Sequence, residues 1–317
     1  MTALAPVDRL EIVTLSDNYV DLVSMDNSEH VTRAMPVKNM SFSNSVLAEH
    51  GFSALVRVTA GGSTRSIVMD FGLSPDAAAR NAEAIGLDLG CAEAAVLSHG
   101  HLDHFGGLSA VAARIGKKGL PFVAHPAAFP PGRFIEPIPG VKITMPVLTH
   151  QDVERAGFSL SLSSEPLPLL DGTVLFLGEI PRLNDFEKGM PNAFVLDESG
   201  EARWDPLIDD TALAVNVAGK GLVVLSGCAH SGIVNTVNYA KKLAGIGKVH
   251  AVVGGFHLTG AKAAPLIDPT LEALWDLDPD FVVPTHCTGH AASVAFERRF
   301  GSRFLVNMAG TTLTFAS

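Results

Sequence analysis

Short runs of apolar and β-branched residues recur along the whole chain, and helical patterns lie between several of them. Such runs, each bounded by turn-forming residues, include 54–58, 66–70, 94–97, 222–226 and 249–253. Helical patterns cover residues 76–85, 106–115, 233–244, 269–275 and 291–300. Closely spaced strands followed by strand–helix alternation in both halves predict a layered protein of the α/β class, with helices on the outer faces of its sheets.

The composition narrows the class of protein. With 317 residues, of which 47% are hydrophobic, the chain can bury a large core. Its 23 Lys and Arg residues against 33 Asp and Glu residues give a net charge of −10, which argues against nucleic-acid binding and against an anionic membrane surface. The first residues lack the regions of a signal peptide, and no apolar run is long enough to cross a membrane. We therefore expect a cytoplasmic protein with a small-molecule substrate. The sequence is also compatible with a homo-oligomer.

The sequence His99-Gly100-His101-Leu102-Asp103-His104 crowds metal-binding side chains directly after the strand-like run 94–97. In an extended segment alternate residues share a side, so His99, His101 and Asp103 are expected to point one way and His104 another. Neutral imidazole and carboxylate suit zinc, iron and manganese. The spacing predicts that this segment serves two adjacent divalent metal ions, with zinc preferred and iron or manganese allowed.

Three later histidines, His230, His257 and His286, each follow a strand-like run and lie among small residues. Loops at strand ends form the sites of layered α/β proteins, so these histidines are expected to converge on the first cluster. A metal ion needs about three protein ligands and an open position for water. We predict that His230 joins the first two histidines of the motif, and that His286 joins its Asp–His end. Contact with substrate or with a ligand is the alternative for both, and it is the role assigned to His257.

Asp70 and Cys228 have less certain roles. Asp70 closes the apolar run 66–70, where a carboxylate can accept the free N–H of a ligand histidine and fix its tautomer. An ordinary turn-forming aspartate is the alternative. Cys228 lies two residues before His230, which allows a cysteine nucleophile with a histidine base, or a thiolate that faces the metals. The nucleophile hypothesis leaves the histidine-rich motif unexplained. The three cysteines, Cys91, Cys228 and Cys287, are too few and too scattered to form a disulfide framework.

Residues 126–191 interrupt the alternation of strands and helices. Pro126, Pro130, Pro131, Pro137 and Pro139 lie within the first part of this segment. Because proline removes a backbone donor and fixes φ, this density predicts an insertion of irregular surface loops. Long ordered loops in a compact domain are often lids or substrate-binding elements. The alternative is a solvent-exposed loop segment that has no functional role.

With these pieces in place, the sequence resembles the metallo-β-lactamase superfamily, whose HxHxDH signature is matched by residues 99–104. Within it, the chain is similar to the branch of 7,8-dihydropterin-6-methyl-4-(β-D-ribofuranosyl)aminobenzene 5′-phosphate synthase-like proteins. The stretches that support the branch are 49–53, 70–72, 178–182, 227–236, 254–258 and 284–289.

The resemblance implies one αββα sandwich domain over residues 1–317, with two mixed β-sheets, helices on the outer faces and a dinuclear metal site at one edge. Many members supply a bridging aspartate after a later strand, where this sequence has Cys228. Whether Cys228 or His230 belongs to the inner shell stays open at this point.

Three functional hypotheses follow. The first is a metal-dependent hydrolase whose metal-bound hydroxide attacks a small ester, lactone, amide or phosphodiester, with Asp103 and His257 as catalytic residues. The second, implied by the branch name, is a pterin-linked ribofuranosylaminobenzene-phosphate synthase or transferase, for which Arg133, Arg182 and Phe186 are the available phosphate-binding and aromatic residues. The third is a non-catalytic metal-binding ligand sensor, against which the intact HxHxDH motif argues.

Overall fold

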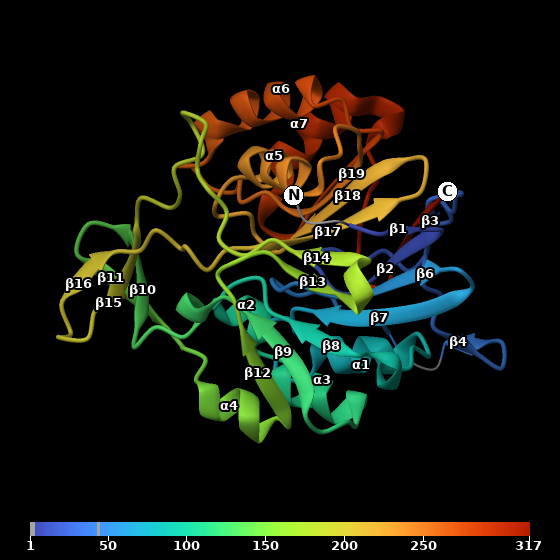
Figure 1. The fold of residues 1–317 in the computed structure, drawn as a ribbon, viewed down its shortest axis with the longest axis horizontal. Coiled ribbons are helices and arrows are strands. Elements are labelled where there is room, and N and C mark those ends of the chain that lie inside the picture. The colour runs from blue at the N-terminus through green and yellow to red at the C-terminus, as the bar shows by residue number, and fades with distance from the viewer. Residues whose placement is uncertain (1–3, 43–44) are drawn as a thin grey trace.

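Two facing β-sheets with helices on their outer sides make up the computed structural model, which describes residues 4–42 and 45–317 (Figure 1). The first sheet has the strand order β12-β9-β8-β7-β6-β2-β21-β3. Its strands in chain order are β2 (Arg9–Ser16), β3 (Val31–Thr32), β6 (Ser53–Ala60), β7 (Ser63–Met69), β8 (Ala94–Val96), β9 (Leu120–Ala124), β12 (Phe158–Leu162) and β21 (Thr312–Ala316).

The second sheet has the strand order β13-β14-β17-β18-β19-β20, and β1 pairs with β17. Its strands are β1 (Pro6–Val7), β13 (Leu167–Leu169), β14 (Val174–Phe176), β17 (Ala212–Val217), β18 (Gly221–Ser226), β19 (Val249–Gly255) and β20 (Phe281–Thr285). Every residue of β18 and β19 is buried, as expected for parallel strands that are covered on both faces.

Helices cover both outer faces of the sandwich. They are α1 (Ala77–Ala84), α2 (Leu102–Phe105), α3 (Leu108–Ile115), α4 (His150–Arg155), α5 (Ile233–Ala244), α6 (Ile267–Asp276) and α7 (His290–Phe300). Figure 1 shows α5, α6 and α7 above the second sheet and α1 and α3 below the first.

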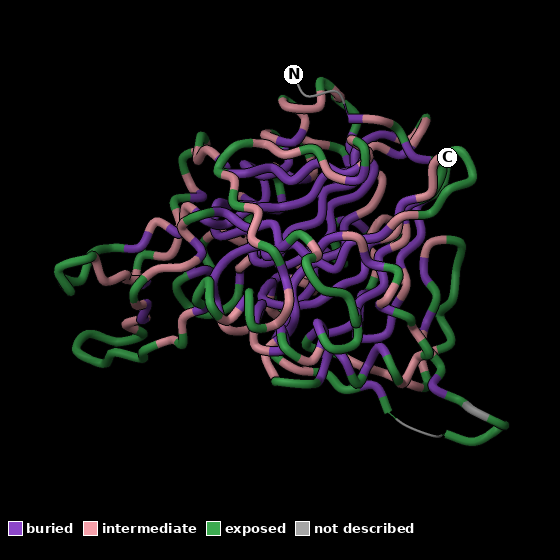
Figure 2. The backbone as a smooth tube through the Cα atoms, turned by 60° about the horizontal axis from the view of Figure 1, so that its bottom comes forward, coloured by how far each residue is buried: buried purple, intermediate pink, exposed green. Residues whose placement is uncertain are grey.

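Three apolar clusters account for the layers. One lies between the sheets and includes Val56 and Ile67 from the first sheet and Val223 from the second. A second joins α5, α6 and α7 to the second sheet, and a third joins α1 and α3 to the first. The buried backbone in the middle of Figure 2 is this stack of layers. The predicted αββα sandwich with two mixed sheets is therefore confirmed.

The segment 126–191 differs from the irregular insertion that its prolines predict. β12 extends the first sheet, and β13 and β14 belong to the second. A separate four-stranded sheet stands at the left of Figure 1, in the order β11 (Val141–Met145), β10 (Arg133–Ile138), β15 (Ala193–Leu196) and β16 (Ala202–Trp204). Pro137 is tolerated in β10 because the pairing with β11 is irregular between Ile135 and Ile138. The remaining strands, β4 (Val37–Lys38) and β5 (Ser41–Phe42), form a two-stranded hairpin.

Among the described residues, no helix has the length and apolar character needed to cross a bilayer.

Gly106 marks the tightest approach between α2 and the chain that follows β7. A Cβ atom at this position would overlap the backbone carbonyl oxygen of Leu73. We expect Gly106→Ala to lower the free energy of unfolding by about 3 kcal/mol, since backbone atoms on both sides leave little room to relax. Denaturant unfolding measures this loss. Gly247→Ala, where the added Cβ meets nothing within 4 Å, is the matched control. Equal stability of the two variants would contradict the prediction.

Candidate metal centre

The carboxyl ends of parallel strands from both sheets carry the predicted site residues. In the first sheet β7, β8 and β9 are parallel, and in the second β18, β19 and β20 are parallel. The HxHxDH motif follows β8, whereas Cys228 and His230 follow β18, His257 follows β19 and His286 follows β20. The fold thus assembles one site from four loops at the edge where such sheets usually bind ligands.

The HxHxDH motif is only partly extended. His99 and His101 lie on the loop after β8, but α2 begins at Leu102, so Asp103 and His104 lie on a helical turn. The expectation that Asp103 points the same way as the first two histidines is therefore wrong, because alternation of sides holds only in extended backbone. The helical turn directs Asp103 and His104 together toward a second position.

The first position is a three-histidine cluster of His99, His101 and His230. Their ligand atoms lie within 4.8 Å of one another, and all three side chains are buried. His99 Nε2 lies 3.2 Å from His230 Nε2. His101 Nε2 is buried and has no hydrogen-bond partner among the described residues. The loops after β8 and β18, one from each sheet, thus present their imidazoles to the same point.

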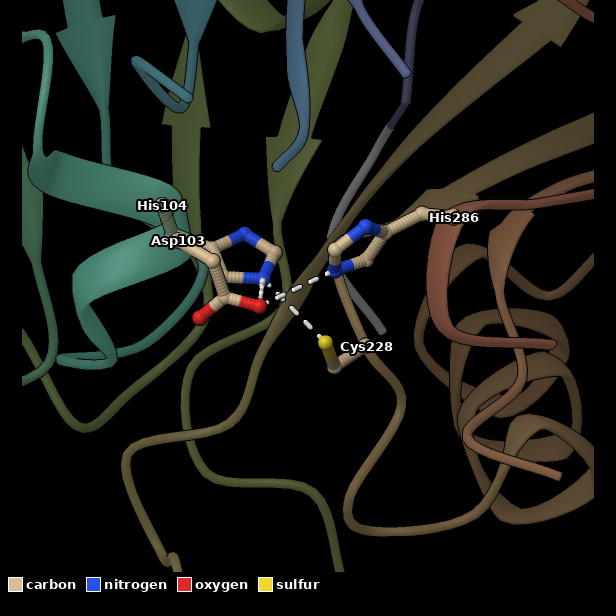
Figure 3. Close-up of side chains that lie close together, drawn as sticks. All are labelled: Asp103, His104, Cys228 and His286. Atoms are coloured by element: carbon tan, nitrogen blue, oxygen red, sulfur yellow. Dashed lines mark hydrogen bonds and ion pairs between the residues drawn. The ribbon is translucent and has the colours of Figure 1, made fainter. Parts of the chain in front are cut away.

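The second position is a four-residue cluster of Asp103, His104, Cys228 and His286 (Figure 3). His104 Nε2 lies 3.1 Å from Cys228 Sγ, and His286 Nε2 lies 3.3 Å from Asp103 Oδ2. Asp103 is the only partly exposed member, and the other three are buried. In Figure 3 the α2 residues approach from one side, and Cys228 and His286 from the other.

Asp70 fixes the orientation of His104. Its Oδ2 lies 2.7 Å from His104 Nδ1 and also accepts a hydrogen bond from the Ser98 hydroxyl, while Oδ1 accepts from the Ser98 backbone N–H. A carboxylate can only accept, so in the neutral imidazole the proton lies on Nδ1 and the lone pair of Nε2 faces the cluster. Burial acts to lower the pKa of His104, but Asp70 and Asp103 outweigh it and raise the pKa to about 9, so binding of a cation would displace the proton on Nε2. Asp70 therefore has the contact that was predicted for it, rather than a turn-forming role alone.

His257 lies beside the three-histidine cluster. Its ring centroid is 4.3 Å from that of His230, and its ligand nitrogen groups with Cys228 and His230 within 4.8 Å. Cys228, a member of the four-residue cluster, thus also lies near His230 and His257. Cys228 and His230 therefore belong to different clusters and do not compete for one position. The predicted catalytic or substrate-contacting role of His257 stays a prediction, and its position would also allow it to bind a metal ion.

Four of the ten described non-glycine residues with positive φ lie at the site. Asp70, Ala229, His257 and His286 have positive φ values of 58°, 53°, 47° and 46°. Non-glycine residues rarely adopt this left-handed conformation, and it persists where the surrounding structure enforces it. At these strand ends the strained conformation turns the chain and places the side chains that follow at the shared edge.

Burial sets the protonation of the first histidines. Desolvation and the neighbouring His104 hold the pKa of His99 well below its ordinary value. Burial and the nearby Arg133 guanidinium lower the pKa of His101 to about 4. Burial acts to raise the pKa of Asp103, but His104 and His286 outweigh it, so that the pKa is lowered. Neutral imidazoles beside an ionised carboxylate are the forms that bind a divalent cation.

Arg133 ties the four-stranded sheet to the HxHxDH loop. Its side chain is only 2% exposed, and its Nε donates to Asp205 Oδ2 at 2.7 Å. Its Nη2 donates to Asp209 Oδ1 at 2.6 Å, while Asp209 Oδ2 accepts from the Gly100 N–H at 2.8 Å. Arg133 is therefore committed to two buried carboxylates and is not free to bind a phosphate.

The other two residues considered for a phosphate-binding pocket are also engaged. Arg182 donates through Nη2 to the carbonyl oxygens of Pro206 and Leu207, and Phe186 is partly buried against the core. Phe186 is thus part of the core packing, whereas Arg182 keeps a buried Nε that has no hydrogen-bond partner among the described residues.

His50 is a site residue that motif spacing did not single out. Its Nε2 lies 3.7 Å from Asp103 Oδ2, and its ring centroid is 4.9 Å from that of His286. Asn18 links the two histidines, since its amide nitrogen is 3.0 Å from His50 Nδ1 and its Oδ1 is 3.2 Å from His286 Nδ1. The only sequence signal was the stretch 49–53, which entered through family resemblance.

The clusters fit divalent cations by three observations. Within the part of the chain that the structure describes, His101 Nε2 is buried without a hydrogen-bond partner, a costly state that a cation would relieve. His99 Nε2 and His230 Nε2 face one another at 3.2 Å, close to the ~3.4 Å between two nitrogens that each lie about 2.1 Å from a tetrahedral zinc ion. The donor set of nitrogen, carboxylate oxygen and thiol sulfur suits zinc and iron.

Comparison with known proteins agrees with this fold. The family model of the metallo-beta-lactamase superfamily matches residues 48–180, which include β6 to β9 and the HxHxDH motif. A relative from Methanocaldococcus jannaschii, 7,8-dihydropterin-6-methyl-4-(beta-D-ribofuranosyl)-aminobenzene-5′-phosphate synthase, is 30% identical over 315 residues, which cover 98% of this chain and 99% of the relative. The chain belongs to the metallo-beta-lactamase superfamily, and its similarity to the synthase branch extends over nearly its whole length.

Solved structures support the same assignment. A crystal structure of a metal-dependent hydrolase of the beta-lactamase superfamily superposes with a TM-score of 0.73 at 25% identity, covering 97% of this chain and all of that chain. A diphosphatase of the PhnP family superposes with a TM-score of 0.50 at 12% identity, covering 96% of this chain and 98% of that chain, and shares the fold alone.

Proposed function

We propose that this protein is a metal-dependent hydrolase that acts on a small ester, lactone, amide or phosphodiester. The observation that carries the proposal is the convergence of seven ligand-type side chains in two adjacent clusters, with Cys228 between them. A structural metal needs only one closed set of four ligands, whereas a three-histidine set with an open position, directly beside a second set, suits a catalytic pair.

His99, His101 and His230 would hold one cation, and Asp103, His104, Cys228 and His286 the other. When bound there, divalent cations supply Lewis acidity, which polarises the oxygen under attack and acidifies a water molecule. Zinc is the preferred identity, with iron or manganese as alternatives.

The protein side chains orient the reaction. Asp103 is ionised and partly exposed, so its carboxylate can accept a hydrogen bond from an incoming water or substrate beside the four-residue cluster. Asp70 and Asn18 hold the Nδ1 sides of His104 and His286, which directs both Nε2 atoms inward. His257 lies beside His230, where it can contact a substrate that reaches the three-histidine cluster.

Metal removal tests the proposal. We expect protein purified without added metal to contain close to two transition-metal ions per chain by elemental analysis, because two separate ligand sets are present. Dialysis against a chelator should remove hydrolysis of a panel of aryl esters, lactones and bis(4-nitrophenyl) phosphate, and added Zn²⁺, Fe²⁺ or Mn²⁺ should restore it. Undiminished hydrolysis in the metal-free protein would refute the proposal.

Synthase activity is the second candidate, and the near full-length similarity to the M. jannaschii synthase favours it. It would require a pocket for an aromatic ring and a phosphate, to which Arg133 cannot contribute because its guanidinium is bound to two buried carboxylates. Saturable binding of a reduced pterin, measured by fluorescence, together with formation of a coupled product would favour this candidate. Absence of pterin binding would exclude it.

A further inference from the structure

A cavity of about 410 Å³ adjoins the three-histidine cluster. Its lining comes from Pro137 of β10 and from three segments: 187–192, the loop 229–232 after β18, and residues 256–270 between β19 and the middle of α6. His230 and His257 form part of its wall, so a molecule in the cavity would reach the candidate metal centre. This volume lies in the range of sites that bind small organic molecules.

Apolar side chains form most of the remaining wall. Phe256 and Leu258 are buried and extend the core under α6 and α7 to the cavity surface. Met190 and Leu266 contribute from the other segments. An apolar wall of this kind favours a ligand with an aliphatic or aromatic body, because burial of each Å² of apolar surface contributes roughly 25 cal/mol.

The charged groups of the cavity lining are Glu187, Lys188 and Lys262. The Glu187 carboxylate is already satisfied, since it accepts from the backbone N–H groups of Val234 and Asn235, both at 2.9 Å, at the start of α5. Both lysines are exposed. Lys188 Nζ donates to a backbone carbonyl, and Lys262 has no ion-pair partner within the described parts of the chain.

The charge of the lining is opposite to that of the protein. The whole chain carries a net charge of −10, yet the lining carries two lysines against one carboxylate, and that carboxylate is turned toward the N–H groups at the start of α5. A lining of that sign selects anions over cations and neutral molecules.

We propose that this cavity binds the part of the substrate that does not react, that this part is an apolar body of ring size with an anionic group, and that Lys188 and Lys262 contact its phosphate or carboxylate. The proposal rests on the proposed hydrolase in one respect only: it places the reacting group of the substrate at His230 and His257. Lys188 and Lys262 are thereby specificity-determining residues.

Isothermal titration calorimetry on the full-length, metal-containing protein at low ionic strength tests the proposal with non-hydrolysable probes. Phenylphosphonate should bind at least tenfold more tightly than inorganic phosphate, which lacks the ring, and than benzyl alcohol, which lacks the charge. Benzoate is the carboxylate probe, and the tighter binder of benzoate and phenylphosphonate identifies the anionic group. Equal affinity for benzyl alcohol and both anions would overturn the proposal.

Lysine variants locate the anion. Lys188→Met and Lys262→Met should each weaken binding of the preferred anion about threefold to fivefold, as expected for exposed charge pairs, and Lys262→Glu should weaken it further. Affinity for benzyl alcohol should not change. Lys118→Met, which removes one exposed charge before β9, at the end of that strand remote from the site, is the matched control.

The outcomes separate this proposal from the hydrolase. If a variant that combines Lys188→Met and Lys262→Met binds the anions as tightly as the wild type, the metal centre alone holds them and the cavity proposal is wrong. If lysine-dependent binding is found but the metal-containing protein hydrolyses nothing in the substrate panel, the cavity proposal stands and the hydrolase fails.

Discussion

His101→Ala is expected to abolish metal-dependent turnover and to remove one metal ion per chain. His101 supplies one of three buried imidazoles in its cluster, and its Nε2 has no other partner among the described residues. Loss of groups that merely orient metal ligands typically costs 10–100-fold in activity or metal affinity, so loss of a direct ligand should cost more than about 100-fold. Hydrolysis rates together with elemental analysis measure both effects.

A surface histidine provides the control for this variant. His150 is exposed at the start of α4, outside both clusters. His150→Ala should retain the metal content and rate of the wild type. A His101→Ala protein that keeps its full metal content but loses activity would show that His101 acts on substrate rather than as a ligand. Full activity in that variant would contradict the proposed site altogether.

Arg133→Met is expected to destabilise the protein by about 3–5 kcal/mol. The substitution preserves much of the side-chain volume but leaves the carboxylates of Asp205 and Asp209 buried without their counterion. Denaturant unfolding followed by circular dichroism measures the loss. Because Asp209 also holds the Gly100 N–H between two motif histidines, metal affinity should fall as well.

The destabilisation by Arg133→Met should depend on pH. Burial acts to raise the pKa of Asp209, but Arg133 outweighs it and lowers the pKa in the wild type. The wild-type carboxylate therefore contributes stability above the unfolded-state pKa, about 3.9, which is lost only as pH falls through the folded-state value. Without Arg133 burial dominates, the pKa rises above the unfolded value, and stability falls as pH increases.

The deficit of Arg133→Met should accordingly be larger at pH 8 than at pH 5. Adding Asp209→Asn should recover part of it, since the amide oxygen can still accept from Gly100 and no charge remains at that position. A deficit independent of pH, with no recovery in the double variant, would mean that lost packing rather than the unpaired carboxylate destabilises the protein.

The periodicity of the sequence predicted the layers because each layer is built from local patterns. A run such as 222–225 is apolar at every position and forms a strand buried on both faces. The segment 126–191 was harder to interpret, because prolines report where a donor is missing but not which sheet a short strand joins. β12 and β14 take their places through partners in β9 and β17, the latter more than 35 residues further along the chain.

The site was predictable where ligands share a short motif and less so where contacts connect distant residues. The sequence predicted the groups that the structure brings together, His99 and His101 with His230, and Asp103 and His104 with His286. Their metal binding stays a prediction. Arg133 could not be interpreted correctly, because its partners lie 72 and 76 residues away and nothing in its local sequence indicates burial.

Each cluster draws its members from loops far apart in the chain, and this has a consequence for biosynthesis. The three-histidine cluster is complete only after residue 230 has been added, and the four-residue cluster only after residue 286. When the HxHxDH motif has emerged from the ribosome but the later residues have not, the nascent chain therefore presents only an incomplete, low-affinity set of potential ligands. At the proposed metal sites, tight capture would wait until both sheets have docked, so loading of the second position would be a late step in maturation, when the finished fold can select among the available cations.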